Sequence, residues 1–239
     1  MSCSPDTTSP AVCDVTDSIW SPQDGTVAVD GLHAPVLHPP RLIPGGWHTP
    51  IDVSLIAVCG IPGAGKSTVS AHLKAIGLDA WDTDEDGFAE WREQGSKLPV
   101  AEPDDWHDEE ATRGIEYCVR RDRVEELRRR AVGKIVYLCG FAGGEDEYRD
   151  LFDLMIVIGV DNDTLSHRLA TRTTNNYGKA AHEREAILKA NIGWAESYRS
   201  RGAVIVNGTR PLAEVAAEII SIANAWHTSS RSGDAPPLP

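Results

Sequence analysis

Between about residues 51 and 228, short apolar runs alternate with longer stretches in which apolar and polar positions are mixed. The run at 53–59 is almost continuously apolar, which is typical of a strand buried on both faces of a parallel sheet. The same pattern predicts four further strands, at 79–81, 135–139, 154–160 and 203–206. It predicts helices at 66–76, 110–131, 162–172, 182–201 and 212–226. Because helices separate the strands, the predicted fold class is α/β, a three-layer sandwich with a five-stranded parallel sheet.

The two ends of the chain lack this alternation. Residues 1–50 contain eight prolines scattered among Ser, Thr, Asp and Gly. Proline removes backbone donors and resists regular structure, so we predict a mostly disordered arm there, with one short run at 26–29 that could pair as an edge strand. The tail at 229–239 is also predicted to be flexible. One folded domain, at 51–228, remains between them.

The pattern G-x-x-x-x-G-K-[ST] stands directly after the first predicted strand and opens the first predicted helix. Glycines let backbone N–H groups converge on phosphate oxygens, and the helix N-terminus points its positive end at the same anion. Lys66 is expected to reach the β and γ phosphates, and the Ser67 hydroxyl to bind Mg²⁺. The motif therefore predicts a P-loop NTPase that binds ATP with Mg²⁺. The expected phosphate-binding residues are Gly60, Ile61, Pro62, Gly63, Ala64, Gly65, Lys66, Ser67 and Thr68.

A P-loop alone does not separate kinases, GTPases and ATPase motors. The Asn-Lys-x-Asp base reader of guanine-specific GTPases does not occur in the chain. The third predicted strand ends at Cys139-Gly140 without the carboxylate of a conventional Walker B motif, and Asp161 is assigned to the start of the next helix. The acid must therefore come from elsewhere.

Asp82-Thr83-Asp84 follows the second predicted strand, at the edge where open α/β sheets bind ligands. Alternate residues of an extended segment point to the same side, so Asp82 and Asp84 could face one cavity. One carboxylate could hold Mg²⁺, and the other could orient or deprotonate an acceptor hydroxyl. The alternative is an acidic turn that caps the next helix.

A P-loop at the first strand with Asp-x-Asp after the second resembles the small-molecule kinases of the nucleoside monophosphate kinase fold, among which shikimate kinase and gluconate kinase are similar in layout. The resemblance covers about residues 53–226. It implies that Asp82 serves the metal and Asp84 the acceptor. It also implies a lid, placed near 173–180, that brings arginines to the transferring group. Arg168 and Arg172, one helical turn apart just before it, are the candidates, with ordinary surface arginines as the alternative.

The chain also departs from these families. The Arg-Pro lid motif of shikimate kinases and the Asp-Gly-aromatic-Pro-Arg stretch of adenylate kinases are absent, and the glycines at 138–145 are arranged differently. The insert at 91–110 is expected to cover the acceptor site without identifying the acceptor. The segment at 207–211 resembles a loop that packs on adenine, although a plain strand-to-helix turn would explain it equally well.

Charge and cysteine content limit the partners. The formal net charge of -13 makes nucleic acid and anionic lipid poor partners. The arginine-rich stretch at 120–130 is interleaved with acids, so it is predicted to be a solvated helix with Val124 and Leu127 inward. Five cysteines without Cys-x-x-Cys spacing indicate reduced thiols. With no recognisable leader or 20-residue apolar stretch, the predicted location is cytoplasmic.

The predicted function is that of an ATP-dependent kinase, which transfers the γ-phosphate to a hydroxyl of a small metabolite. Its expected catalytic residues are Lys66, Asp84, Arg168 and Arg172. Two alternatives stay open: a nucleoside monophosphate kinase, and a nucleotide-binding regulator with little turnover that signals through its amino-terminal arm. The expected partners are ATP and a small-molecule acceptor, and the oligomeric state is left open.

Overall fold

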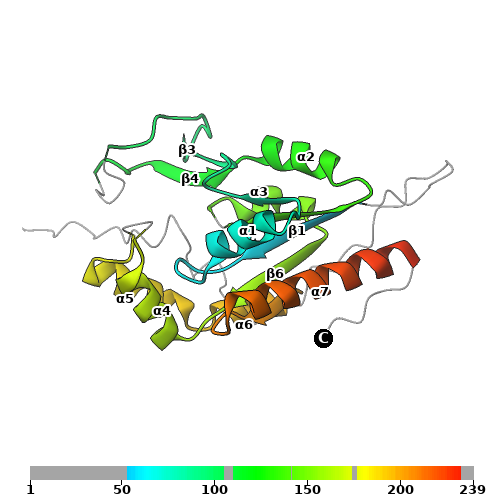
Figure 1. Ribbon diagram of the computed structural model, residues 1–239. Helices are drawn as coiled ribbons and strands as arrows, with labels where there is room; N and C mark the ends of the chain where they lie inside the picture. The colour runs from blue at the N-terminus through cyan, green and yellow to red at the C-terminus, as the bar shows by residue number, and fades with distance from the viewer. Residues whose placement is uncertain (1–52, 105–109, 141, 174–176, 233–239) are drawn as a thin grey trace, which may run out of the picture.

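The computed structural model describes residues 53–104, 110–140, 142–173 and 177–232. Within them a five-stranded sheet has the order β2-β5-β1-β6-β7, and all of its pairings are parallel (Figure 1). This confirms the predicted α/β class. The predicted arm at 1–50 lies outside the described residues. The strands are β1 Ser54–Cys59, β2 Ala80–Asp82, β5 Ile135–Cys139, β6 Leu154–Gly159 and β7 Val204–Asn207.

The sheet is the middle of three layers, because successive residues of β1 point to opposite faces. Ile56 and Val58 join the apolar cluster that contains residues of α1 and α7. Leu55 packs in a cluster with α2 and α3, and Ala57 packs with residues of α6. Figure 1 shows the sheet between these groups of helices. Their bounds are α1 Lys66–Ala75, α2 Arg121–Arg130, α3 Glu145–Tyr148, α6 Trp194–Ser200 and α7 Leu212–Ser232.

The predicted helix at 110–131 is wrong in its first half. There the chain forms β4, Ile115–Val119, antiparallel to β3, Ala89–Glu93, and the helix α2 starts only at Arg121. Gly114, at φ +77°, allows the turn that leads into the strand. The charged residues of this stretch favour a helix in a sequence-based prediction. The strand β4 is instead stabilised by its pairing with β3, which lies far from it in the sequence.

Two other helix boundaries also differ from the prediction. The predicted helix at 182–201 is two helices, α5 at Ala181–Asn191 and α6, because Gly193 adopts φ +76° between them. Helix α7 continues to Ser232, beyond the predicted end at 226, so the first residues of the predicted tail are helical. No helix in the described part of the chain is both long and apolar enough to cross a membrane.

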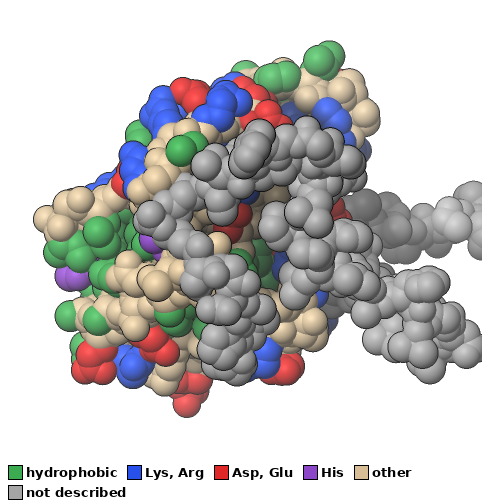
Figure 2. Space-filling view, turned by 90° about the vertical axis from the view of Figure 1, so that its right-hand side faces the viewer, with side chains coloured by type: hydrophobic (Ala, Val, Ile, Leu, Met, Phe, Trp, Pro, Cys, Tyr) green, Lys and Arg blue, Asp and Glu red, His purple; other side chains and the backbone are tan. Residues whose placement is uncertain are grey.

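The arginine-rich helix α2 is solvated on one side, as predicted. Val124 and Leu127 are buried, while Arg121 pairs with Glu125 at 2.9 Å. One turn further along the helix, Arg130 pairs with Glu126 at 2.6 Å. Figure 2 shows basic and acidic side chains interspersed at the top of the molecule, where α2 lies. This alternation of charge leaves no uniformly basic surface over α2.

The β3–β4 hairpin borders the carboxyl-terminal edge of the sheet. The amide of Val119 donates to the carbonyl of Gly143 at 3.2 Å, and the amide of Gly143 donates to the carbonyl of Tyr117 at 2.9 Å. These bonds fix the hairpin to the loop that follows β5. Helices α4, Asn162–Thr171, and α5 lie on the other side of the same edge (Figure 1). The first residues of the insert predicted at 91–110, which belong to β3, are thus part of a wall beside the carboxyl-terminal edge, whereas residues 105–109 lie outside the described part of the chain.

Candidate nucleotide and acceptor site

The P-loop runs from the end of β1 to the start of α1 and is tightly packed. Gly63 has φ +89°, and a Cβ there would lie 2.9 Å from Leu165 Cδ1 of α4. Gly65 is the left-handed cap of α1, at φ +107°. Both conformations favour glycine. The loop therefore holds the amino-terminal end of α1 at the sheet edge, where its free N–H groups can meet an anion.

The Lys66 side chain bonds to the backbone of the P-loop itself. Its Nζ donates to the carbonyl of Ile61 at 3.2 Å. Burial lowers the pKa of Lys66, and the nearby Asp84 carboxylate is the largest of the charges that oppose this effect. The side chains of Ser67 and Thr68 are exposed. The ammonium group of Lys66 and the accessible hydroxyl of Ser67 are the groups that the motif provides for a polyphosphate with a metal ion, and Thr68 adds a second accessible hydroxyl.

One carboxylate oxygen of Asp82 accepts hydrogen bonds, and the other has no hydrogen-bond partner among the described residues. The side chain is 1% exposed, and its Oδ1 accepts from the amides of Asp84 at 3.0 Å and Glu85 at 3.2 Å. Its Oδ2 is buried and has no hydrogen-bond partner among the described residues. An unsatisfied buried acceptor costs about 1–3 kcal/mol. An ion or its water shell next to Oδ2 would relieve this cost, so the donor set fits a hard cation such as Mg²⁺.

The helix-cap alternative for these acids is not what the chain forms. Residues 83–87 make a turn, and the next regular element is the strand β3. Within that turn, the carboxylate of Asp86 accepts from the amide of Asp82 at 2.6 Å and pairs with Lys74 of α1 at 2.7 Å. Asp82 therefore shapes a turn through Oδ1, and the turn presents Asp84 to solvent.

Asp84 lies between the phosphate side and the hairpin. Tyr117 Oη donates to Asp84 Oδ1 at 3.2 Å. Desolvation by the surrounding protein is the main cause that raises the pKa of Asp84, and the negative charge of Asp82 is the second. The residue remains exposed to solvent. Lys66 and the Tyr117 hydrogen bond oppose this rise. A carboxylate with a raised pKa is a better proton acceptor for a hydroxyl.

Tyr117 is a site residue that our sequence interpretation missed, because it fell inside the predicted helix at 110–131. The alternation of Ile115, Tyr117 and Val119 is the signal that could have revealed the strand. Tyr117 stands opposite Trp91 in the hairpin register, with ring centroids 5.3 Å apart. Together they form an aromatic wall next to Asp84.

A close contact sets the spacing between the Asp82–Asp84 turn and the loop after β5. The amide of Thr83 donates to the carbonyl of Cys139 at 2.9 Å. A Cβ at Gly140, where φ is +154°, would lie 1.9 Å from Thr83 Oγ1. No side chain other than hydrogen fits there, so this glycine holds the acids at the sheet edge.

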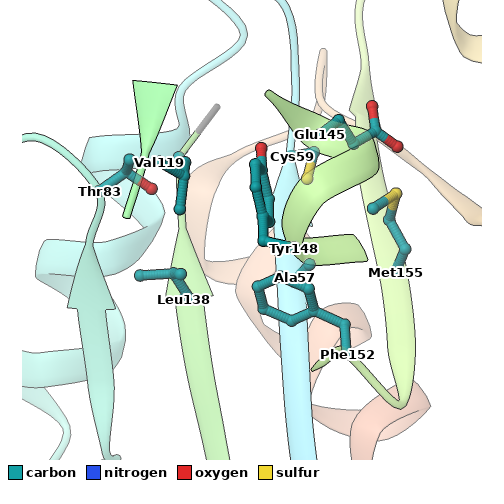
Figure 3. A pocket seen from close by; sticks show the side chains of 10 residues that line it. Ala57, Cys59, Thr83, Val119, Leu138, Glu145, Tyr148, Phe152 and Met155 are labelled. Atoms are coloured by element: carbon teal, nitrogen blue, oxygen red, sulfur yellow. The ribbon is translucent and has the colours of Figure 1, made fainter. Parts of the chain in front are cut away.

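Below these loops lies a small cavity, whose lining side chains include Cys59, Thr83, Glu145 and Tyr148 (Figure 3). Tyr148 Oη donates to the carbonyl of Ala142 at 3.1 Å, and Glu145 is engaged by arginines and a tyrosine. Burial raises the pKa of Cys59 to about 12, so its thiol is not a nucleophile at neutral pH. The polar groups of this cavity are satisfied, which sets it apart from the Asp82 position.

The two predicted lid arginines differ in their environment. Arg168 bridges two loops: its Nη1 donates to the carbonyl of Ala64 at 3.0 Å and its Nη2 to that of Gly208 at 2.7 Å. Arg172 follows the end of α4, and its charge lowers the pKa of Lys66. Burial lowers the pKa of Arg172 itself, with Glu183 as the main opposing charge. Arg168 is thus fixed to the P-loop backbone, and Arg172 lies close enough to Lys66 for its charge to act on that ammonium group.

The other predicted ligand segments are only partly described. Of the lid near 173–180, residues 174–176 lie outside the described part. Gly178 is packed, since a Cβ there would lie 2.9 Å from Ile187 Cδ1. In the segment at 207–211, Asn207 Oδ1 accepts from the amide of Thr209 at 3.0 Å. This turn and the Arg168 bond to the Gly208 carbonyl fix the loop.

Solved structures that are similar to this chain include two shikimate kinases and a sugar kinase. A shikimate kinase from Aquifex aeolicus is 18% identical and covers 71% of this chain and 96% of its own, with a TM-score of 0.39. A sugar kinase from Janibacter sp. HTCC2649, in an unliganded structure, is 13% identical, with coverage of 77% and 99% and a TM-score of 0.41. A shikimate kinase from Acinetobacter baumannii in complex with shikimate is 18% identical, with coverage of 71% and 92% and a TM-score of 0.47.

No curated protein sequence matches the chain. The family AAA_18, described as AAA domain, matches residues 56–189, a stretch that includes the P-loop, both acids and both lid arginines. That stretch is more than half of the chain, and it extends from β1 into α5. This protein therefore belongs to the AAA_18 family, and the matched stretch carries its P-loop between β1 and α1.

Proposed function

We propose that this protein is an ATP- and Mg²⁺-dependent kinase, which transfers the γ-phosphate to a hydroxyl of a small metabolite. The observation that carries the proposal is the position of Asp84. Its carboxylate lies between Lys66 of the P-loop and Tyr117 of the hairpin. A carboxylate at that place can serve an acceptor while the P-loop holds the donor.

The donor would be held mainly by backbone and by Lys66. The backbone N–H groups of the P-loop would bind the phosphates together with those of the first turn of α1, except that Pro62 has no N–H and that of Ala64 donates to the Ile61 carbonyl. Ser67 and the free Oδ2 of Asp82 would hold Mg²⁺, which supplies neutralising charge on the phosphate oxygens. Lys66 would exchange its bond to the Ile61 carbonyl for the β and γ phosphate oxygens.

In the transfer step, the oxygen of the acceptor hydroxyl would bond to the γ-phosphorus, and the bond from that phosphorus to the bridging oxygen of ADP would break. Asp84 would accept the hydroxyl proton, and the raised pKa of its carboxyl group supports this role. Arg172, on the phosphate side, would stabilise charge on the transferring group. Arg168 would instead keep the P-loop and the loop at 207–211 in place.

The alternative of a nucleotide-binding regulator leaves the acceptor side unexplained. A protein that only binds ATP needs the P-loop and the metal ligands. It does not need Asp84, a carboxylate with a raised pKa that lies next to the aromatic wall of Trp91 and Tyr117. The Asp84–Tyr117 arrangement therefore favours an enzyme that binds a second substrate.

The test is ATP consumption with a panel of hydroxyl compounds, followed by Asp84→Asn. With any acceptor that is turned over, we expect kcat to fall on the order of a hundredfold, since the amide accepts a proton poorly. The matched control is Glu85→Gln, which changes the exposed neighbouring acid. Equal activity of both variants would remove Asp84 from the chemistry, and no acceptor-dependent ATP consumption with any compound would count against a kinase.

A further inference from the structure

We infer that the acceptor carries no carboxylate or phosphate group: it is a neutral or amino-bearing polyhydroxyl compound of the sugar class. This inference rests on the proposed function, because it names the substrate that the Asp84 side of the site would take. The argument comes from the arrangement of aromatic rings and charges on the β3–β4 hairpin.

The hairpin presents aromatic rings next to the acid. Trp91 and Tyr117 are register partners, so their side chains share one face of the hairpin. Both are half-buried, and the Tyr117 hydroxyl reaches Asp84 at 3.2 Å. Ring faces next to a carboxylate suit the C–H faces and hydroxyls of a sugar, and they also attract an amino group. The rings of Trp91 and Tyr117 can thus stack on a sugar while the Asp84 carboxylate accepts hydrogen bonds from its hydroxyls.

The cations on the opposite face of the hairpin are already neutralised. Arg92 donates to Glu116 at 2.9 Å and to both oxygens of Glu147 at 2.6 and 2.7 Å, and its side chain is 9% exposed. Lys97 donates to Glu116 at 2.6 Å and lies 3.7 Å from Glu147. Since Arg92 alternates with Trp91 along β3, its guanidinium points away from the aromatic wall. It ties the hairpin to α3 and cannot serve an anionic acceptor.

Other basic side chains near the hairpin have contacts of their own, and Arg123 lies 5.5 Å from the centroid of the Phe88 ring. Arg120 pairs with Asp122 at 2.8 Å and lies 3.6 Å from Glu90. Arg113 is exposed and precedes β4, beyond the outer end of the hairpin. The residues that the structure leaves out inside the domain, 105–109, 141 and 174–176, include no lysine or arginine.

The charges that act on the Tyr117 hydroxyl are negative. Burial is the main cause that raises its pKa, and the carboxylates of Asp84, Glu102 and Asp82 raise it further. Lys66 and Arg172 belong to the phosphate side, where ATP would occupy them. An acceptor with its own carboxylate or phosphate would meet like charge, and no described residue beside the wall offers it an uncommitted guanidinium, which is unfavourable in a partly desolvated site. The same reasoning excludes a nucleoside monophosphate as acceptor.

The decisive experiment compares acceptors that differ only in charge. The full-length protein, with Mg²⁺ and ATP, is given a hexose, the corresponding 2-amino hexose, the corresponding hexonate and a hexose phosphate, and the set is repeated for pentoses and with nucleoside monophosphates. We expect the neutral or amino member to exceed its anionic counterpart at least a hundredfold in kcat/KM. A carboxylate or phosphate compound that is the better substrate overturns the inference.

Binding separates this inference from the proposed function. Calorimetry with the same compounds, in the presence of Mg²⁺ and a non-hydrolysable ATP analogue, should detect the neutral or amino compounds and not the anionic ones. If that pattern is found without any phosphoryl transfer, the proposed kinase function fails while the acceptor class stands. Binding of only the anionic compounds, or of none of the panel, overturns the acceptor class.

A variant pair tests the aromatic wall itself. Trp91→Ala should raise KM for the acceptor about tenfold or more and leave KM for ATP within twofold, because the ring touches the acceptor side only. Trp91→Phe keeps a ring and is expected to restore most of the affinity. Equal acceptor KM in wild type and Trp91→Ala, with the fold intact by circular dichroism, contradicts a stacking wall.

Discussion

The proposed nucleotide side and the proposed acceptor side of this site are built in different ways. The nucleotide side comes from one contiguous segment, the P-loop and the first turn of α1, and it uses mainly backbone groups. The acceptor side combines side chains from three distant segments: Asp84 after β2, Tyr117 on β4, and the loop after β5 that Gly140 begins. A backbone cradle recognises the phosphates that all nucleotides share. Side chains that meet across the fold can instead change with the acceptor.

The two sides also differ in how they are held. Leu165 of α4 packs on Gly63, and Arg168 bonds to the Ala64 carbonyl, so the P-loop is fixed from outside by apolar and backbone contacts. The acceptor side is fixed by the ion pairs of Arg92 with Glu116 and Glu147 behind the hairpin. Substitutions on each side should therefore affect different measurements, with ATP binding on one side and acceptor binding on the other.

The largest expected effect comes from Lys66→Ala, which removes the positive side chain of the nucleotide side. We expect kcat/KM for ATP to fall on the order of a thousandfold, since the charge that neutralises the β and γ phosphates is lost. Steady-state kinetics and ATP calorimetry measure this directly. Lys189→Ala, at an exposed position on α5, is the control. Unchanged ATP affinity and activity in Lys66→Ala would remove the P-loop from the function.

Gly140→Ala should break the junction on which the acceptor side depends. The new Cβ would lie 1.9 Å from Thr83 Oγ1, so the turn that carries Asp82 and Asp84 must move. We expect a loss of about 2–4 kcal/mol in the free energy of unfolding, measured by urea titration, together with a higher Mg²⁺ requirement. Gly95→Ala is the matched control, because no atom lies near a Cβ there. If the two variants are equally stable, the close contact does not constrain the turn.

Arg168 on α4 and Arg172, directly after that helix, test whether the nucleotide side contains separate holding and transfer elements. Arg172→Ala is expected to lower single-turnover transfer on the order of a hundredfold, with little change in ATP affinity, because its role would come in the transition state. Arg168→Ala should weaken ATP binding instead, since Arg168 joins the carbonyls of Ala64 and Gly208. Equal losses of binding and transfer in both variants would show that the arginines only hold the nucleotide.

The sequence predicts the proposed nucleotide side in more detail than the proposed acceptor side, and the reason is physical. The P-loop is a local pattern, in which glycine spacing, strand and helix all lie within one short segment. The parallel direction of the five strands also follows from general rules of α/β folds, because helices separate the strands. Asp84 could be placed because it follows a strand that ends at the binding edge.

Tyr117 could not be placed in the same way, because β4 owes its conformation to β3, which lies far from it in sequence. The surrounding charges favoured a helix, and only the partner strand decides otherwise. The free oxygen of Asp82 and the Arg92 ion pairs likewise depend on contacts between distant segments. Chemistry that depends on side-chain packing across the fold is not visible in a local pattern.

The smallest expected effect concerns the hydrogen bond that joins the hairpin to the acid. Tyr117→Phe removes the 3.2 Å bond to Asp84 but keeps the ring beside Trp91. Burial, chiefly, raises the pKa of Tyr117, so the hydroxyl stays protonated and donates to Asp84 across the working pH range. That donation lowers the pKa of Asp84, and its loss should raise it further.

Asp84 accepts a proton only when it is ionised, so kcat/KM should fall as pH drops through its pKa. In Tyr117→Phe this acid limb should therefore move to higher pH, with at most a fewfold loss of activity on the plateau. A pH–rate profile of wild type and variant, with the acceptor below its KM, measures the shift. Trp91→Phe, which leaves the hydrogen bond in place, should keep the wild-type limb. An acid limb that moves to lower pH in Tyr117→Phe, or does not move at all, would show that Asp84 is not the group whose ionisation controls transfer.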